Sequence, residues 1–236
     1  MLTEHEAEEF RIRRVIETWA IARDSGDWAA FASVWHDDGW MTATWFQGPA
    51  AEFVRVSQAG FEAGVNILHF LGGTISTLSA NTGSSSTGSA NTGSANTAAG
   101  DRAVAQTKMQ IMQRAEVHGV TADVTCTGRF YDFLAKRDGR WGLVRRQPIY
   151  EKDRLDPVDP AAQLSLDAKL LGSFPVGYRH LAYLQYQLGY QIAPGLPGLR
   201  GPAVDVLYQE GRDWLDGSPR PGVPTADHLR APGGTA

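Results

Sequence analysis

The order of hydrophobic patterns along the chain constrains its fold more than any single motif. Helical spacing comes first and runs to about Arg23, carried by Ile12, Val15, Ile16 and Trp19. The segment Asp24-Ser25-Gly26-Asp27 ends this helix, because Gly26 suits the left-handed residue at a helix end and Asp27 suits an N-cap. We therefore expect a second helix over residues 28–35.

A short strand and a third helix complete the first half of the domain. Gly39 is expected to open the strand, which covers residues 40–46, and Gly48-Pro49 to start the helix. That helix is predicted to carry Phe53, Val56 and Phe61 inward.

Strand patterns fill the second half. They cover residues 65–77, 102–114, 120–136 and 140–150, and Arg137-Asp138-Gly139 is a hairpin signal between the last two. Helices followed by an antiparallel meander indicate an α+β domain with helices on one face of the sheet. Because that face mixes aromatic and polar residues, we expect the sheet to curl around a cavity.

Two segments lie outside this pattern. Residues 79–100 repeat Ser-Ala-Asn-Thr three times amid Gly, Ser and Thr, which predicts a flexible hairpin loop, with a functional lid as the alternative. Residues 155–236 form an extension with a linker at 156–160, helices at 161–171, 178–190 and 203–215, and a Pro/Gly-rich tail from 217. The second helix is amphipathic through Leu181, Leu184 and Leu188, so the extension should pack over the cavity mouth or in a subunit interface. The predicted domains are thus 1–154 and 155–236.

Composition excludes several classes of function. The net charge is −4 with no basic stripe, so no nucleic-acid partner is expected. Cys126 is the only cysteine, which rules out an internal disulfide and a cysteine-based zinc site. The acidic start is unlike a signal peptide, and no apolar run reaches the ~20 residues of a membrane span. A soluble cytoplasmic protein without a membrane partner is expected.

Proton transfer is the chemistry that remains. No histidine pair has metal-ligand spacing, and neither a dinucleotide-binding loop nor a Gly-x-Ser-x-Gly motif is present, so neither metal nor cofactor is expected. His69 lies in the most apolar strand, and Asp24 lies at the end of the first helix. From the residues alone, His69 could equally be a hydrogen-bonded core residue, and Asp24 could satisfy turn groups.

A family resemblance favours the catalytic interpretation. The segments 22–28 and 31–40, the strand Ile67-Leu68-His69-Phe70 and the hairpin 136–141 resemble the nuclear transport factor 2-like superfamily. Within it, the chain is similar over residues 5–152 to the SnoaL-like branch, which includes scytalone dehydratase, bile-acid 7α-dehydratase and hexachlorocyclohexane dehydrochlorinase. The resemblance implies a cone-shaped, cystatin-like antiparallel sheet with three helices, here followed by the helical extension.

The resemblance also implies roles for particular residues. His69 would remove a proton, Asp24 would orient it, and Arg146, with Arg145 one register away, would stabilise developing negative charge. The family's catalytic Lys, about one turn before the Asp, is replaced by an apolar residue near Trp19, which argues against halide elimination. The candidate substrate-binding residues are Trp40, which matches a cavity Trp of the family, and Trp45, Phe53, Arg129 and Tyr131.

These inferences predict a cofactor-free lyase, most simply a dehydratase. Its substrate would be a hydrophobic cyclic molecule of the polyketide, steroid or terpene kind. An isomerase or a polyketide cyclase would use the same site, and a non-catalytic module that binds a small molecule or a protein remains the alternative from another class. A homo-oligomer, dimer or trimer, is expected.

Overall fold

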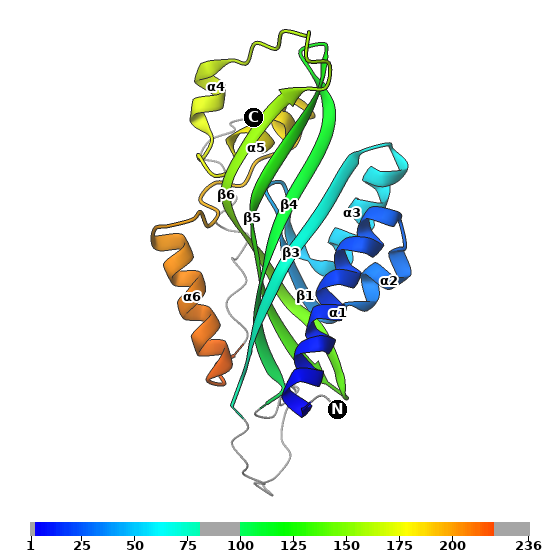
Figure 1. Ribbon diagram of the computed structural model, residues 1–236, viewed down its shortest axis with the longest axis vertical. Coiled ribbons are helices and arrows are strands. Elements are labelled where there is room, and N and C mark those ends of the chain that lie inside the picture. The colour runs from blue at the N-terminus through cyan, green and yellow to red at the C-terminus, as the bar shows by residue number, and fades with distance from the viewer. Residues whose placement is uncertain (1–2, 81–99, 220–236) are drawn as a thin grey trace, which may run out of the picture.

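The computed structural model describes residues 3–80 and 100–219, and Figure 1 shows their arrangement. A curled, open sheet of six strands has the order β2-β1-β6-β5-β4-β3. Neighbouring strands are antiparallel except β1 and β6, which run parallel. The strands are β1 (Trp35–Thr42), β2 (Gln47–Pro49), β3 (Asn66–Leu78), β4 (Arg102–Val117), β5 (Val120–Arg137) and β6 (Arg140–Pro157). This confirms the predicted α+β class.

Three helices cover one face of the sheet, which we call the inner face (Figure 1). They are α1 (Glu4–Ser25), α2 (Trp28–Ser33) and α3 (Ala50–Glu62). Thr3 and Glu6 form a capping box at the start of α1, and Gly26 ends that helix with φ 78°. The side chain of Asp27 then caps α2, as its sequence position predicts.

The two-residue turn between β5 and β6 confirms the predicted hairpin. Asp138 and Gly139 both have positive φ, 50° and 76°, which is the backbone of a type I′ turn. His118 and Gly119 join β4 to β5 in the same way, with φ of 51° and 77°. These tight turns fix the register of the three longest strands.

The extension divides over both faces of the sheet. Its helices are α4 (Ala168–Ser173), α5 (Arg179–Gln187) and α6 (Pro202–Leu215). Helix α5 joins the inner-face core, where Leu181 and Leu184 are buried as predicted. The carboxylate of Asp153 on β6 holds the start of α5 by accepting from the backbone nitrogens of His180 at 2.6 Å and Leu181 at 2.8 Å. Helix α6 packs on the opposite, outer face through Leu207 and Trp214.

Several predicted boundaries were wrong. Strand β1 starts at Trp35, inside the predicted second helix, because Trp35 pairs with Leu143 of β6 and this tertiary pairing overrides the local pattern. Strand β6 runs on to Pro157, which pairs with Ala122, so the predicted linker begins inside the sheet. A proline is tolerated there because β1 pairs only with residues 143–146, so no described strand pairs with that edge of β6 at Pro157.

Helix boundaries and faces also differ in places. Helix α4 begins at Ala168, where Asp167 caps it, rather than at residue 161. Phe61 and Leu188 are 43% and 44% exposed, because each lies at the end of its helix, where the apolar stripe leaves the core. The predicted flexible loop and the tail fall mainly on residues 81–99 and 220–236, which lie outside the described residues.

Candidate functional site

The structure brings Asp24 and His69 together at the meeting of α1 and β3. Oδ2 of Asp24 accepts from the backbone nitrogen of His69 at 2.5 Å, and Oδ1 lies 2.9 Å from Nδ1 of the ring. Both oxygens of one carboxylate therefore hold the same residue. Since the side chains are only 14% and 7% exposed, water competes little with these bonds.

Arg23 ties this pair to the fold, and sequence reasoning missed it. Its guanidinium Nη1 donates to the carbonyl of Ile67 at 3.1 Å and lies 3.3 Å from Oδ1 of Asp24. Burial lowers the pKa of Arg23, and the neighbouring carboxylate opposes that shift. In the sequence, Arg23 is recognisable only as an arginine near the end of a helix, and nothing there indicates its contact with the site.

Three aspects of the His69 ring suit it to accept a proton. Burial lowers its pKa below the ordinary 6.5, with the hydrogen bond that the ring donates to Asp24 acting in the opposite direction, so the neutral form of the ring predominates at neutral pH. The edge-to-face contact with Trp19, at 5.1 Å and 82°, fixes the ring plane. Because Nδ1 faces a carboxylate, the neutral ring carries its proton there, which leaves Nε2 as the ring nitrogen that can accept a proton.

A small cavity lies against this ring. Its volume is about 30 Å³, room for one or two water molecules. Apolar side chains from the sheet and from α1, α3 and α5 form most of its wall, and among the predicted substrate-binding residues Trp45 and Phe53 belong to it. The polar members of the wall are Arg23, Thr44, His69, Tyr150 and Gln185.

The extension supplies part of this wall. Leu181 and Gln185 of α5 face the cavity, so the extension packs over the site, which is one of the two positions expected for it. The hydroxyl of Thr44 donates to Oε1 of Gln185, whose Nε2 donates to Oε1 of Gln113 at 3.0 Å. A glutamine in an amphipathic helix resembles a surface residue, so nothing in the sequence identified this buried chain of polar groups.

Tyr150 adds a buried hydroxyl to the same wall. It is 1% exposed, and burial raises its pKa well above the ordinary value of 10, while Thr44 beside it acts in the opposite direction. The phenol therefore keeps its proton at any physiological pH. It is a hydrogen-bond donor in an apolar surrounding, and sequence reasoning did not propose it.

Arg146 does not line the cavity, contrary to its predicted place. It is fully buried and forms two hydrogen bonds of 2.7 Å with Asp132. Its guanidinium lies between the rings of Trp19 and Phe130, 4.3 and 4.2 Å from their centres. These rings separate the charge from the cavity, so Arg146 acts on His69 only as one of the nearby charges that lower its pKa.

Three other predicted residues lie on the outer face. Strand β5 alternates, so Phe130 faces inward while Arg129 and Tyr131 face α6. Arg129 bonds Glu151, Gln106 and Tyr208, and Tyr131 packs where Gly211 leaves room for its ring. Trp40 pairs with Arg145 in the register of β1 and β6, which also places it on the outer face. None of the three belongs to the wall of the His69 cavity.

Two negative findings bear on the class of site. Within the described parts of the chain, no group of three or more His, Cys, Asp or Glu side chains could hold a metal ion. Among the helices described, none is long and apolar enough to cross a membrane.

The fold and the site together define an α+β protein with a curled sheet, in which a buried His–Asp pair faces a cavity. Comparison with known families places it further: residues 5–147 match the SnoaL-like domain, and the chain belongs to that family. The predicted family is thereby confirmed.

Fungal relatives match the extension as well as the domain. A PEP2-like protein of Fusarium vanettenii is 33% identical over 89% of this chain and 86% of its own length. Pea pathogenicity protein 2 of the same fungus is 31% identical with the same coverage, and an uncharacterized protein of Emericella nidulans is 32% identical over 89% of this chain and 87% of its own.

Solved structures are more distant. A hexachlorocyclohexane dehydrochlorinase has a TM-score of 0.49 and 12% identity, covering 70% of this chain and 97% of its own. A putative scytalone dehydratase from Novosphingobium aromaticivorans has a TM-score of 0.48 and 14% identity, covering 68% of this chain and 97% of its own.

Proposed function

We propose that the chain is a cofactor-free lyase of the dehydratase type, with His69 as the general base. The observation that carries this proposal is the arrangement of the ring: Nδ1 faces Asp24 at 2.9 Å, and the ring lines a mainly apolar cavity. A neutral imidazole held in one tautomer is a suitable base at neutral pH. The substrate class remains that of a hydrophobic cyclic molecule, because the cavity wall is mainly apolar.

The proposed reaction is an elimination of water next to a carbonyl group. Nε2 of His69 takes the proton from the carbon beside the carbonyl, and the electron pair of that C–H bond forms a carbon–carbon double bond. The C–O bond to the hydroxyl group on the next carbon breaks, and the imidazolium returns its proton to the leaving hydroxide as water. Asp24 stabilises the imidazolium in between, an interaction strengthened by the scarcity of water.

Substrate binding requires the cavity to open. A cavity of about 30 Å³ is far below the ~300–1,000 Å³ typical of small-molecule sites. The sheet strands in the wall are held by long ladders, whereas α5 contributes Leu181 and Gln185 from a helix of nine residues. We therefore expect α5 to move when a substrate enters.

The other candidate functions share the same residues. An isomerase would return the proton to another carbon, and the low exposure of His69 suits this, because a sheltered proton exchanges slowly with water. A polyketide cyclase would close a ring with the same base. A binding module would use the cavity alone, and its distinguishing sign is indifference to the loss of His69.

The test begins with native mass spectrometry of the purified protein to identify a retained ligand. Turnover of that ligand is then compared for the wild type, His69→Ala and the exposed control His5→Ala, with products identified by mass. We expect His69→Ala to lose about 10²–10⁴-fold in rate and His5→Ala to be unchanged. Loss of 18 mass units without ring closure indicates a dehydratase, and unchanged mass indicates an isomerase or a cyclase, which are distinguished by whether the product has a new ring. Near-full turnover by His69→Ala would refute the proposed base.

Homo-oligomer formation stays a prediction, which sedimentation of the purified protein would test. The absence of a nucleic-acid partner is likewise an expectation from the charge pattern.

A further inference from the structure

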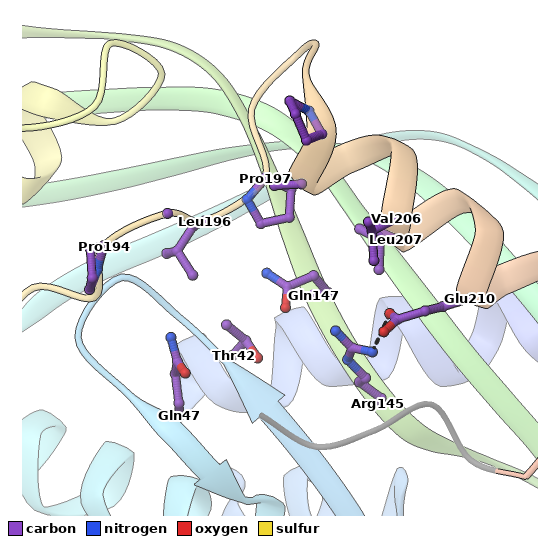
Figure 2. Close-up of a pocket in the computed structure, with 13 residues that line it drawn as sticks. Thr42, Gln47, Arg145, Gln147, Pro194, Leu196, Pro197, Val206, Leu207 and Glu210 are labelled. Carbon is purple, nitrogen blue, oxygen red and sulfur yellow. Dashed lines mark hydrogen bonds and ion pairs between the residues drawn. The ribbon is translucent and has the colours of Figure 1, made fainter. Parts of the chain in front are cut away.

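We infer that the outer face carries a second small-molecule site, for a neutral, mainly apolar ligand with one carbonyl or hydroxyl group. Figure 2 shows the cavity concerned, which we call the outer cavity. Its volume is about 460 Å³, and it lies between the sheet, α6 and the loop before α6. The size is within the ~300–1,000 Å³ of small-molecule sites.

The outer cavity is separate from the His69 cavity. Thr42 and Gln147 belong to its floor, whereas their neighbours Met41 and Pro148 line the His69 cavity on the other side of the sheet. The outer cavity shares no lining residue with the His69 site. Its outer wall, from Pro194 to Glu210, belongs wholly to the extension.

The floor holds buried polar groups that lack partners. Thr42 is 1% exposed, and its hydroxyl makes no hydrogen bond in the part of the chain described here. Arg145 is 6% exposed, and its Nε is likewise buried and unpartnered among the described residues. Gln147, between them in Figure 2, uses its Nε2 on the carbonyl of Pro148 at 3.2 Å. Buried polar groups in native proteins are generally satisfied, so unpartnered groups on residues that line a cavity point to a ligand or water as their partner.

The charge at this site favours a neutral ligand. Glu210 of α6 forms an ion pair with Arg145 at 2.6 Å, drawn as a dashed line in Figure 2. The positive charge is therefore already compensated, and an anionic ligand would meet the Glu210 carboxylate as well. The groups that remain without a partner among the described residues are the Nε–H of Arg145 and the hydroxyl of Thr42; both atoms are covered by protein, so a ligand reaches them when these side chains turn toward the cavity. A carbonyl or hydroxyl oxygen can accept from both.

The rest of the wall is apolar and partly rigid. The floor is surrounded by Pro194, Leu196, Pro197, Val206 and Leu207. Because the proline ring already fixes the backbone angle φ, the two prolines lose little backbone freedom when a ligand binds. The loop itself is anchored, because the backbone nitrogen of Tyr150 donates to the carbonyl of Pro197 at 2.9 Å. Such a wall suits a ring system and needs little ordering on binding.

The experiment uses three probes on the full chain with labelled methyl groups. The probes are 1-tetralone, a neutral bicyclic ketone; tetralin, the same rings without oxygen; and 1-naphthoate, an anion. Methyl shifts of Val206 and Leu207 report the outer cavity, and those of Ile67 and Leu181 report the His69 cavity. We expect 1-tetralone to shift the first pair in a saturable way and to bind about 2- to 12-fold tighter than tetralin, the range of one hydrogen bond.

Variants then assign the binding to its residues. Thr42→Val keeps the shape and removes a hydroxyl without a partner, so it should fold at least as stably and lose about 2- to 12-fold in affinity for 1-tetralone but not for tetralin. Val206→Phe should block the outer cavity, whereas the control Gln209→Phe, also exposed on α6 but outside the lining, should not. Shifts confined to Ile67 and Leu181, tighter binding of 1-naphthoate, or an unchanged affinity in Thr42→Val would each overturn the inference.

Discussion

Replacing Asp24 with Asn tests the proposed mechanism through the tautomer of His69. The backbone N–H of His69 can only donate, so the Asn oxygen must accept from it, as Oδ2 of Asp24 does at 2.5 Å. The Asn NH₂ group then faces Nδ1, where Oδ1 stood at 2.9 Å. Two donors cannot share that contact, so the ring proton should move to Nε2. The nitrogen that faces the cavity would then be unable to accept a proton.

The expected loss of rate is about 10²–10⁴-fold, or about 2.7–5.4 kcal/mol in the activation free energy. The free energy of unfolding should fall by less than the activation free energy rises, about 1.5–3 kcal/mol, because hydrogen bonds to a charged group and the contact with Arg23 are lost while the shape of the side chain is kept. Two assays measure this without ambiguity. Turnover of the retained ligand gives the rate, and ¹⁵N chemical shifts of the ring give the tautomer without any substrate.

Asp27→Asn is the matched control. Asp27 caps α2 by accepting from Ala30 at 3.0 Å, and Asn caps helices about as well as Asp. This control should therefore leave both the rate and the His69 tautomer unchanged. A wild-type ring already protonated at Nε2, or an Asp24→Asn variant within about threefold of the wild-type rate against the 10²-fold minimum expected, would refute the reasoning.

Three further predictions follow from other contacts. Because the pKa of His69 is lowered and its neutral form is the base, kcat/KM should stay constant through neutral pH and fall only below the ordinary pKa of 6.5. The free energy of unfolding should also fall below that pH, since the unfolded chain binds the proton more readily than the folded chain. A pH–rate profile and urea unfolding at the same pH values check both. Gln185→Leu should lower the free energy of unfolding by about 1–3 kcal/mol, because Thr44 and Gln113 lose their partner, with the exposed Gln209→Leu as control. Arg146→Met should cost about 3–5 kcal/mol by leaving the Asp132 carboxylate unpaired in the core, and Arg146→Met with Asp132→Leu should recover most of it.

The sequence was sufficient for the fold and for the pair at the centre of the site. Helical spacing before Asp24 and the apolar run around His69 located each residue on its element, and the family resemblance brought the two elements together. The meander could be predicted from its tight two-residue turns, because Asp138-Gly139 is one of the few residue pairs that readily adopt positive φ at both positions of such a turn. These features depend on short-range physics, which a sequence expresses directly.

The choice between Arg145 and Arg146 could not be made in this way. Adjacent residues of a strand point to opposite faces, and the pairing of β5 with β6 shifts between Phe133 and Leu134, so the face of each arginine depends on that irregularity. The same alternation turned Arg129 and Tyr131 toward α6. Gln185 was hidden for a different reason, since its burial depends on how the extension docks rather than on any pattern within α5.

The docking of the extension connects the two cavities physically. Helices α5 and α6 lie on opposite faces of the sheet, and two backbone hydrogen bonds attach the segment between them to the domain. The nitrogen of Ala193 in the segment donates to the carbonyl of Thr44 at 2.7 Å, and the carbonyl of Pro197 in the segment accepts from the nitrogen of Tyr150 at 2.9 Å. Thr44 and Tyr150 line the His69 cavity, while Pro194 and Pro197 line the outer cavity. Any shift of α5 that admits a substrate to the His69 cavity should therefore also move the segment between α5 and α6, which forms part of the wall of the outer cavity. A ligand that rigidifies this loop should raise the free energy of opening α5, in keeping with the reciprocity of coupled sites.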